Sequence, residues 1–278
     1  MILLDGKALS DKLYDTLKEN PENATTKLII LTFGEDPASK VYVRNKLKAC
    51  ERVGIKSEHI ILDENMSIEE FDGYLCKLVN ENVIDYVAPN NHLGIILQLP
   101  APQKFVELFN ENITPYFDVD GFGSRNRELL ALYGNPVNYP ATPKGIMTML
   151  EHYNIDVEGK HVVIIGRSDI VGKPLATMML NKNATVTICH SKTQNLETIT
   201  RTADILVAAI GKPKFINASH IKDGVTIIDV GINRTENGLC GDVDFDDVKD
   251  KCYAITPVPG GVGPMTVYSL IENTCKNT

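Results

Sequence analysis

Residues 160–174 read Lys-His-Val-Val-Ile-Ile-Gly-Arg-Ser-Asp-Ile-Val-Gly-Lys-Pro and carry the strongest structural signal in the chain. The apolar run Val162–Ile165 predicts a buried strand that ends at Gly166, and the residues after Gly172 favour a helix. A strand, a glycine turn and a helix in this order typically bind a dinucleotide. Glycine lets the backbone approach phosphate oxygens, and the helix offers unpaired N–H groups at the positive end of its dipole. The match to Gly-x-Gly-x-x-Gly is loose, since Ser168 replaces the second glycine and the last glycine comes one residue late.

The segment after the next predicted strand, residues 184–189, indicates which dinucleotide binds. An NAD-specific site usually has Asp or Glu here to bind the ribose hydroxyls. This chain instead has Ser191 and Lys192, and Arg167 lies in the first turn. These side chains suit a 2′-phosphate, so the sequence favours NADP over NAD. The alternative is a merely polar turn.

On both sides of this segment, strand and helix patterns alternate from end to end. The predicted strands are Lys27–Phe33, Gly94–Leu99, 161–165, 184–189, 204–209, 225–230 and Cys252–Ile255. The predicted helices are 5–19, Pro37–Val53, one opened by the capping box of Ser67 and Glu70, Gln103–Asn112, one capped by Thr142, and a final one over about 264–275. Such alternation predicts parallel sheets covered on both faces.

The stretch 113–142 is rich in glycine and proline and predicts a loop region at a boundary between two lobes. We therefore predict an α/β protein of two lobes with a cleft between them. Residues 1–140 form an N-terminal substrate lobe, and the final helix, 264–278, packs back on it. Residues 141–263 form a Rossmann-type lobe with a parallel sheet that binds the dinucleotide.

Composition narrows the class of protein. The 278 residues carry a net charge of −8 with no block of lysines or arginines, which argues against nucleic acid as the main partner. No apolar run approaches the roughly 20 residues of a membrane span, and the opening Met-Ile-Leu-Leu-Asp is too short for a signal peptide. The six cysteines form no Cys-x-x-Cys pair, as in a cytoplasmic protein with reduced thiols. The histidines are scattered, so we expect no metal site.

Two positions in the first lobe could carry chemistry. Tyr42 and Lys46 lie four apart in a predicted helix and share one face, where a phenol and an amine can handle protons; the same spacing is also common on plain helix surfaces. Gln98 interrupts the apolar strand Gly94–Leu99. It lies either at an exposed strand end or at the carboxyl end of a strand, where α/β proteins bind ligands.

Two loops are further candidates. Asp118-Val-Asp120-Gly121 is an acidic loop of a kind that is usually a solvated turn. The run Pro259-Gly-Gly-Val-Gly263 leaves a bare backbone just before a predicted helix. It favours close approach of a flat ligand, with a hinge as the alternative.

Together these segments resemble the bifunctional methylenetetrahydrofolate dehydrogenase/methenyltetrahydrofolate cyclohydrolase family over almost the whole length. The matching stretches in the first lobe are 34–39, Tyr42-Val-Arg-Asn-Lys46, Gly94–Pro100 and 118–121, and Thr142-Pro-Lys-Gly145 matches at the start of the second. Those in the second lobe are Gly166–Pro174, His190-Ser-Lys-Thr193, Asp229-Val-Gly-Ile-Asn233, Gly241-Asp-Val-Asp-Phe245 and Thr256–Thr266.

The resemblance implies NADP-dependent oxidation of 5,10-methylenetetrahydrofolate to the 5,10-methenyl compound and its hydrolysis to 10-formyltetrahydrofolate. It also implies a homodimer formed through the nucleotide-binding lobe, and a place in cytoplasmic one-carbon metabolism, which serves purine, histidine and methionine biosynthesis. The implied catalytic residues are Tyr42, Lys46, Gln98 and Asp120. The implied folate contacts add Leu97, Leu99, Pro259, Gly260, Gly261, Val262 and Gly263. The implied NADP contacts are Gly166, Arg167, Ser168, Ser191 and Ile232.

Within this resemblance, Lys46 is the expected proton handler of the hydrolytic step, with Gln98 orienting it, and Asp120 is expected to bind the amino-pyrimidine edge of the pterin. The chain departs from the family at Phe117, where lysine is common, at Gly123-Ser124 in place of His-Pro, and at Ala141 in place of cysteine. These changes predict altered loop packing or folate affinity rather than lost chemistry.

Three rival functions remain open at this point. They are a dehydrogenase without cyclohydrolase activity, a shikimate-type dehydrogenase, and a nucleotide-binding sensor without turnover.

Overall fold

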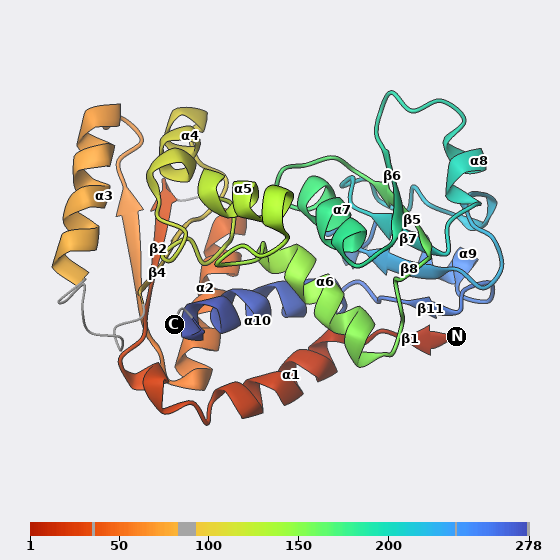
Figure 1. The fold of residues 1–278 in the computed structure, drawn as a ribbon, viewed down its shortest axis with the longest axis horizontal. Helices are drawn as coiled ribbons and strands as arrows, with labels where there is room; N and C mark the ends of the chain where they lie inside the picture. The colour runs from red at the N-terminus through yellow and green to blue at the C-terminus, as the bar shows by residue number, and fades with distance from the viewer. Residues whose placement is uncertain (35–36, 83–92, 237, 277–278) are drawn as a thin grey trace. The chain divides into compact units, whose positions relative to one another are not determined.

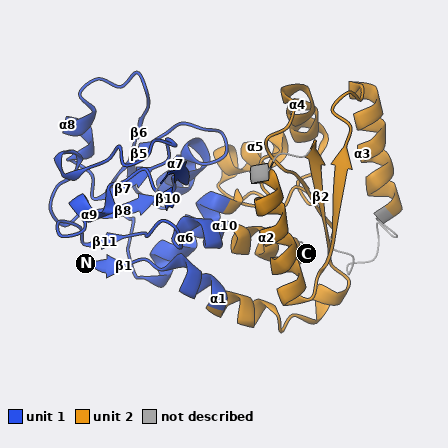
Figure 2. Ribbon diagram, turned by 180° about the vertical axis from the view of Figure 1, so that it is seen from behind, with its two compact units in different colours: residues 1–11, 142–266 blue, residues 12–141, 267–278 orange. Residues whose placement is uncertain are grey.

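The computed structural model describes residues 1–34, 37–82, 93–236 and 238–276. The chain divides into two compact units, coloured separately in Figure 2. Unit 1 comprises Met1–Asp11 and Thr142–Thr266, and unit 2 comprises Lys12–Ala141 and Val267–Thr278. Each unit therefore contains two separate segments of the sequence.

Unit 1 is built on a six-stranded sheet in which every neighbouring pair is parallel (Figure 1). Across the sheet the strands are β1 (Ile2–Leu3), β11 (Ala254–Ile255), β8 (Thr226–Asp229), β7 (Ile205–Ala208), β5 (His161–Ile165) and β6 (Thr185–Cys189). The other elements are α6 (Ala141–His152), α7 (Gly172–Asn181), α8 (Leu196–Thr200), η2 (Ala218–His220), the hairpin β9 (Asn233–Thr235) and β10 (Gly238–Cys240), and α9 (Phe245–Val248).

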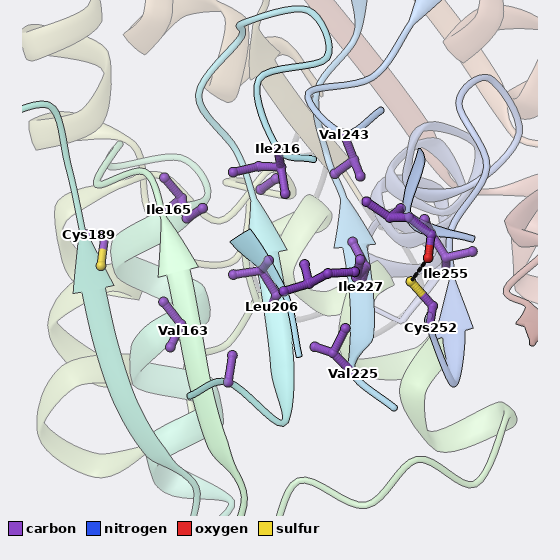
Figure 3. Packing of buried hydrophobic residues seen from close by; sticks show 14 residues of the cluster. Val163, Ile165, Cys189, Leu206, Ile216, Val225, Ile227, Val243, Cys252 and Ile255 are labelled. Carbon is purple, nitrogen blue, oxygen red and sulfur yellow. Dashed lines mark hydrogen bonds between the residues drawn. The ribbon is translucent and has the colours of Figure 1, made fainter. Parts of the chain in front are cut away.

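The core of unit 1 lies against the central strands. Val163, Leu206 and Ile227 from β5, β7 and β8 line up in Figure 3, and all three are fully buried. Ile216 and Val243, from loops beyond the strands, belong to the same cluster. Each such side chain contributes about 1.5–3 kcal/mol by leaving water, and the continuous apolar strands are typical of a parallel sheet covered on both faces.

Unit 2 contains a three-stranded parallel sheet in the order β3 (Lys56–Leu62), β2 (Lys27–Phe33) and β4 (Leu93–Leu97). Its other elements are η1 (Pro21–Ala24), α2 (Pro37–Val53), α3 (Ile68–Asn82), α4 (Gln103–Asn112) and α5 (Ser124–Tyr133). Phe33 stacks on Phe105 with ring centroids 4.4 Å apart, and Phe71 meets Phe105 edge-on. These three rings fix α3 and α4 on one face of the sheet.

The boundary between the units falls inside two helices, α1 (Gly6–Leu17) and α10 (Val262–Cys275). The last turns of α10 pack on unit 2. The Tyr268 ring lies 5.2 Å from that of Tyr14, and Asn273 Nδ2 donates to the carbonyl oxygens of Val119 and Tyr139. Residues 267–278 are thus grouped with the substrate lobe of the sequence prediction.

The structure confirms an α/β protein in two parts, with a parallel Rossmann-type sheet in the C-terminal one. Met1–Asp11 differ from expectation: they lie in unit 1, because β1 pairs with β11, and a two-residue strand leaves no detectable pattern. The sequence also failed to indicate β3, most of whose residues are exposed or partly exposed, and α5, whose first turn is polar. None of the described helices is long and apolar enough to cross a membrane.

Candidate active site

Lys46 lies in the middle of α2 and is only 8% exposed, although it is a lysine. Its Nζ donates a hydrogen bond of 2.9 Å to Oε1 of Gln98, the residue that directly follows β4. The Gln98 amide donates in turn to the carbonyl oxygen of Leu99, at 3.0 Å. Gln98 therefore has the hydrogen bonds that a polar group at this position needs, and it fixes the direction of the Lys46 amine.

Asp120 supplies the opposite charge. Burial lowers the pKa of Lys46, and the negative charge of Asp120 works against that lowering. Burial likewise raises the pKa of Asp120, and Lys46 holds it down. A lysine with a lowered pKa has a larger neutral fraction near pH 7 and can exchange protons with a ligand.

The other candidates of unit 2 lie beside this group in the sequence. Tyr42 is one turn before Lys46 on α2, and the residue is 42% exposed, so a ligand can reach it. Leu97 is buried as the last residue of β4, while Leu99 is exposed and is followed by a cis peptide bond to Pro100. Glu35 and Asp36, in one of the segments that carry the family resemblance, lie outside the described residues.

The loop that carries Asp120 is organised by Asp118, a carboxylate that is 1% exposed. Asp118 accepts hydrogen bonds from the backbone N–H groups of Gly121, Phe122 and Gly123, at 3.0, 3.1 and 2.7 Å, and from the Asn126 amide at 2.8 Å. The acidic residues of this segment predicted a solvated turn, and for Asp118 that prediction is wrong. Several N–H groups of one tight turn converge on the carboxylate, a contact that residue spacing does not reveal.

Burial raises the pKa of Asp118 to about 6, while the bonds from Asn126 and the turn hold it down. Asn126 also donates to the carbonyl of Pro115 and accepts from the backbone N–H of Asn138. The Asp120 loop is therefore held from three separate stretches of chain.

The departures from the family pattern have local explanations. A Cβ added at Gly123 would lie 2.9 Å from both Asp118 Oδ2 and Ile113 Cγ2, so this backbone comes too close to the buried carboxylate for most side chains. Phe117 packs against the apolar cluster of unit 2. Ala141 is buried, and its N–H donates to the carbonyl of Asp120 at 3.3 Å.

In unit 1, the turn after β5 is closely packed and suits a phosphate-bearing ligand. Gly166 has φ +129°, and a Cβ there would collide with the carbonyl oxygen of Ala209. A Cβ at Gly172 would collide with the carbonyl oxygen of Gly166. Ser168 Oγ accepts from the N–H of Val171 at 3.2 Å, which shapes the turn in place of a second glycine. The backbone cradle of a dinucleotide site is thus present.

The side chains expected to bind the 2′-phosphate are available around this cradle. Arg167, Ser191 and Lys192 are all exposed. The turn after β6 is itself ordered, since the His190 N–H donates to Thr193 Oγ1 at 2.8 Å. These residues therefore fit an anionic group at the carboxyl edge of the sheet.

The glycine run 259–263 also lies in unit 1. Gly260 has φ +109°, and its carbonyl accepts from the N–H of Lys7 at 2.8 Å. Ile232, the expected NADP contact, is 46% exposed, and its Cδ1 would lie 3.5 Å from a Cβ placed on Gly263. The glycine run thus adjoins the expected cofactor contact within one unit. Among the described residues, no group of His, Cys, Asp or Glu is arranged to hold a metal ion.

Comparisons with known proteins cover both units. A family model described as the catalytic domain of tetrahydrofolate dehydrogenase/cyclohydrolase matches residues 4–120, and one described as its NAD(P)-binding domain matches residues 140–278. A protein of Methanoculleus marisnigri named bifunctional protein FolD is 50% identical over 279 residues, which cover 99% of this chain and 95% of that protein.

Solved structures agree. The bifunctional FolD methylenetetrahydrofolate dehydrogenase/cyclohydrolase of Campylobacter jejuni is 45% identical with a TM-score of 0.91, over 100% of this chain and 98% of that one. The methylenetetrahydrofolate dehydrogenase-cyclohydrolase of Trypanosoma brucei, solved with NADP and an inhibitor, is 33% identical with a TM-score of 0.86, over 98% and 95% of the two chains.

Proposed function

The chain belongs to the tetrahydrofolate dehydrogenase/cyclohydrolase family, and from this premise we propose that its residues carry out two successive reactions on one folate. The first oxidises 5,10-methylenetetrahydrofolate to the 5,10-methenyl compound with NADP. The second hydrolyses that compound to 10-formyltetrahydrofolate. The observation that carries the proposal is the buried Lys46 amine, hydrogen-bonded to Gln98 and paired in charge with Asp120.

Unit 1 would hold the dinucleotide. Gly166 and Ser168 provide the backbone turn for its phosphates, and Arg167 with Ser191 provides a cation and a hydroxyl for the 2′-phosphate. When bound, NADP accepts the two electrons and the hydrogen that leave the methylene bridge. In this step the chain has to hold the folate so that its methylene carbon lies close to the bound NADP. Asp120 suits the paired N–H donors of the pterin edge.

The hydrolytic step moves protons and needs a group that can carry them. Water adds to the methenyl carbon and loses a proton; as the ring opens, a ring nitrogen gains a proton and the remaining O–H proton is lost to form the formyl group, so one proton is released in all. Burial favours the neutral amine of Lys46, which can take the proton of the attacking water and return it to the nitrogen. Gln98 Oε1 holds the amine in place, and Tyr42 is available to bind the same ligand.

One spectroscopic experiment tests the whole proposal. The protein is mixed with 5,10-methylenetetrahydrofolate and NADP, and NADPH and the methenyl compound are followed together. We expect NADPH to form, and added methenyl compound to disappear faster than it does without protein. NADPH formation with no accelerated hydrolysis would identify a dehydrogenase alone. NADP binding with no turnover and no folate binding would identify a sensor.

The choice of cofactor gives a separate prediction. Changing Arg167 and Ser191 together to alanine removes the charge-assisted contacts to a 2′-phosphate. The Michaelis constant for NADP should rise about 10–100-fold, and that for NAD by much less. Steady-state dehydrogenase kinetics with both cofactors measure this, with Arg201→Ala as a control, since Arg201 contacts the Ser219 carbonyl instead. Equal changes for NADP and NAD would contradict the assignment.

A pH prediction follows from the Lys46–Asp120 pair. The charge of Asp120 raises the pKa of Lys46, so Asp120→Asn removes this support and should lower that pKa further. The limb of the hydrolytic pH–rate profile that Lys46 controls should move to lower pH. The profile is measured at saturating methenyl compound, with the uncatalysed rate subtracted at each pH. If the limb stays in place or moves to higher pH, Lys46 is not the group whose titration this limb reports.

Assembly and location complete the proposal. We infer a homodimer formed through unit 1, and a cytoplasmic location in one-carbon metabolism, on the family resemblance. Sedimentation of the purified protein over a range of concentrations tests the dimer, and a single monomeric species at micromolar concentration would exclude it.

A further inference from the structure

Two carboxylates that the two reactions do not use are buried at the carboxyl edge of the unit 1 sheet. Asp229, the last residue of β8, is 3% exposed, and Asp242 is 0% exposed. Burial raises the pKa of Asp229 to about 6, and the nearby charge of Asp242 adds to that rise. Such a costly arrangement persists only where surrounding groups compensate for it.

Seven N–H donors provide that compensation. Asp229 accepts from the N–H groups of Gly231, Asp242 and Val243, at 3.1, 2.9 and 2.9 Å. Asp242 accepts from the N–H groups of Ile210, Gly211 and Lys212 and from the Asn233 amide, at 2.7, 3.0, 2.8 and 2.9 Å. No lysine or arginine side chain is among these donors, so the paired carboxylates bind backbone almost entirely.

The pairing is reciprocal. A Cβ on Gly231 would overlap the carboxylate of Asp242, and a Cβ on Gly241 would overlap that of Asp229. Each acid thus lies against the glycine beside the other acid, and both glycines are required by close approach. Val243, next to Asp242, is buried in the core beside Ile216, with which it forms a β-bridge (Figure 3). The pair is therefore anchored to the packed core of unit 1.

The segments held by the paired carboxylates are the ones that flank the cofactor site. Residues 210–212 directly follow Ala209, whose carbonyl lies against Gly166 in the phosphate turn. Residues 231–233 contain Ile232, the exposed side chain that lies against Gly263. One carboxylate pair thus fixes two loops at the same edge of the sheet, one behind the phosphate turn and one bearing the expected NADP contact.

We propose that Asp229 and Asp242 are positioning residues for NADP: by binding the backbone of both loops, they hold Ile232 and the Gly166 turn at the separation that the dinucleotide needs. They do not touch the cofactor themselves. The inference rests on the proposed function in that NADP is the ligand. It goes further in assigning affinity to two buried acids outside the expected binding residues.

The test variant is Asp242→Asn, which keeps the size of the side chain but turns an acceptor of two N–H groups into a donor. We expect the dissociation constant for NADPH to rise about tenfold or more, while hydrolysis of the methenyl compound, which needs no NADP, stays within about threefold of the parent. The chain has no tryptophan, so NADPH fluorescence reports binding with little protein background. The matched control is Asp246→Asn, whose carboxylate is 79% exposed and bonds Lys249.

Two results would overturn the inference. One is an unchanged NADPH affinity in Asp242→Asn. The other is a parallel loss of NADPH affinity and hydrolysis, which a general destabilisation of the fold would produce. If Asp242→Asn fails to fold, Asn233→Ala decides by the same two measurements, since it removes a single donor to Asp242. A smaller rise in the dissociation constant with hydrolysis intact supports the proposal, and no rise rejects it. Failure of the proposed function is distinct, because the parent protein itself would then neither bind NADPH nor hydrolyse the folate.

Discussion

Lys46→Met should lower the rate of methenyltetrahydrofolate hydrolysis by about 10²–10⁴-fold, the range over which a positioned acid–base group acts, while NADP reduction falls far less. The reason is chemical. In the oxidation step a hydride leaves the methylene carbon as a ring nitrogen donates its lone pair to that carbon, so little proton transfer is needed, whereas water addition cannot proceed without proton transfer. Methionine matches lysine in length and suits a buried position, so the change removes the amine with little disturbance of packing.

The two rates are measured on the same preparation, with 5,10-methylenetetrahydrofolate and NADP for one and the methenyl compound alone for the other. Lys48→Met is the control, because Lys48 lies two residues further along α2 and is exposed. Thermal unfolding of each variant shows whether the loss of the bond to Gln98 has weakened the fold. A folded Lys46→Met protein that loses both activities equally would show that Lys46 binds the folate and does not handle its protons.

Asp118→Ala should have the largest effect on stability. It leaves four N–H donors without their acceptor, in a place with almost no access to water. A buried donor without an acceptor costs about 1–3 kcal/mol, so we expect the free energy of unfolding to fall by at least about 3 kcal/mol. For a protein of this size the melting temperature should drop by roughly 6–12 °C. Folate affinity should fall as well, because the same turn positions Asp120.

The pH dependence of this effect has a defined sign. The pKa of Asp118 is about 6 in the folded protein and 3.8 without the surrounding structure. A group whose pKa is raised by folding stabilises the folded state most below its unfolded pKa, and this contribution is lost as the pH rises through the folded pKa. The loss of unfolding free energy caused by Asp118→Ala should therefore grow as the pH falls from 7 towards 4. Urea denaturation at several pH values measures this loss, with Asp63→Ala, a change of an exposed acid, as the control. A loss that shrinks on acidification would refute the assignment.

The sequence predicted the regular elements well where hydrophobic periodicity is strong. The bounds expected for β2, α2 and α4 agree with the structure, because each has a clear apolar pattern and Gly or Pro beside it. The family resemblance, and not a pattern in the residues, grouped Lys46, Gln98 and Asp120; Lys46 bonds Gln98 and interacts with the charge of Asp120. The sequence could not predict the roles of Asp118, Asp229 and Asp242. Their contacts are with backbone N–H groups, which every residue except proline possesses, so side-chain identity carries no trace of them.

The division of the chain into two discontinuous units limits how this protein can be cut into fragments. The polypeptide passes from one unit to the other inside α1, near Thr142 and again inside α10, so neither unit is one continuous piece. A gene cut at residue 141 yields a downstream fragment without the edge strand β1 and an upstream fragment without Tyr268 and Asn273. The two units therefore cannot be exchanged as modules by a single crossover. A chimaeric protein that takes one whole unit from a relative must exchange both of the sequence segments that make up that unit.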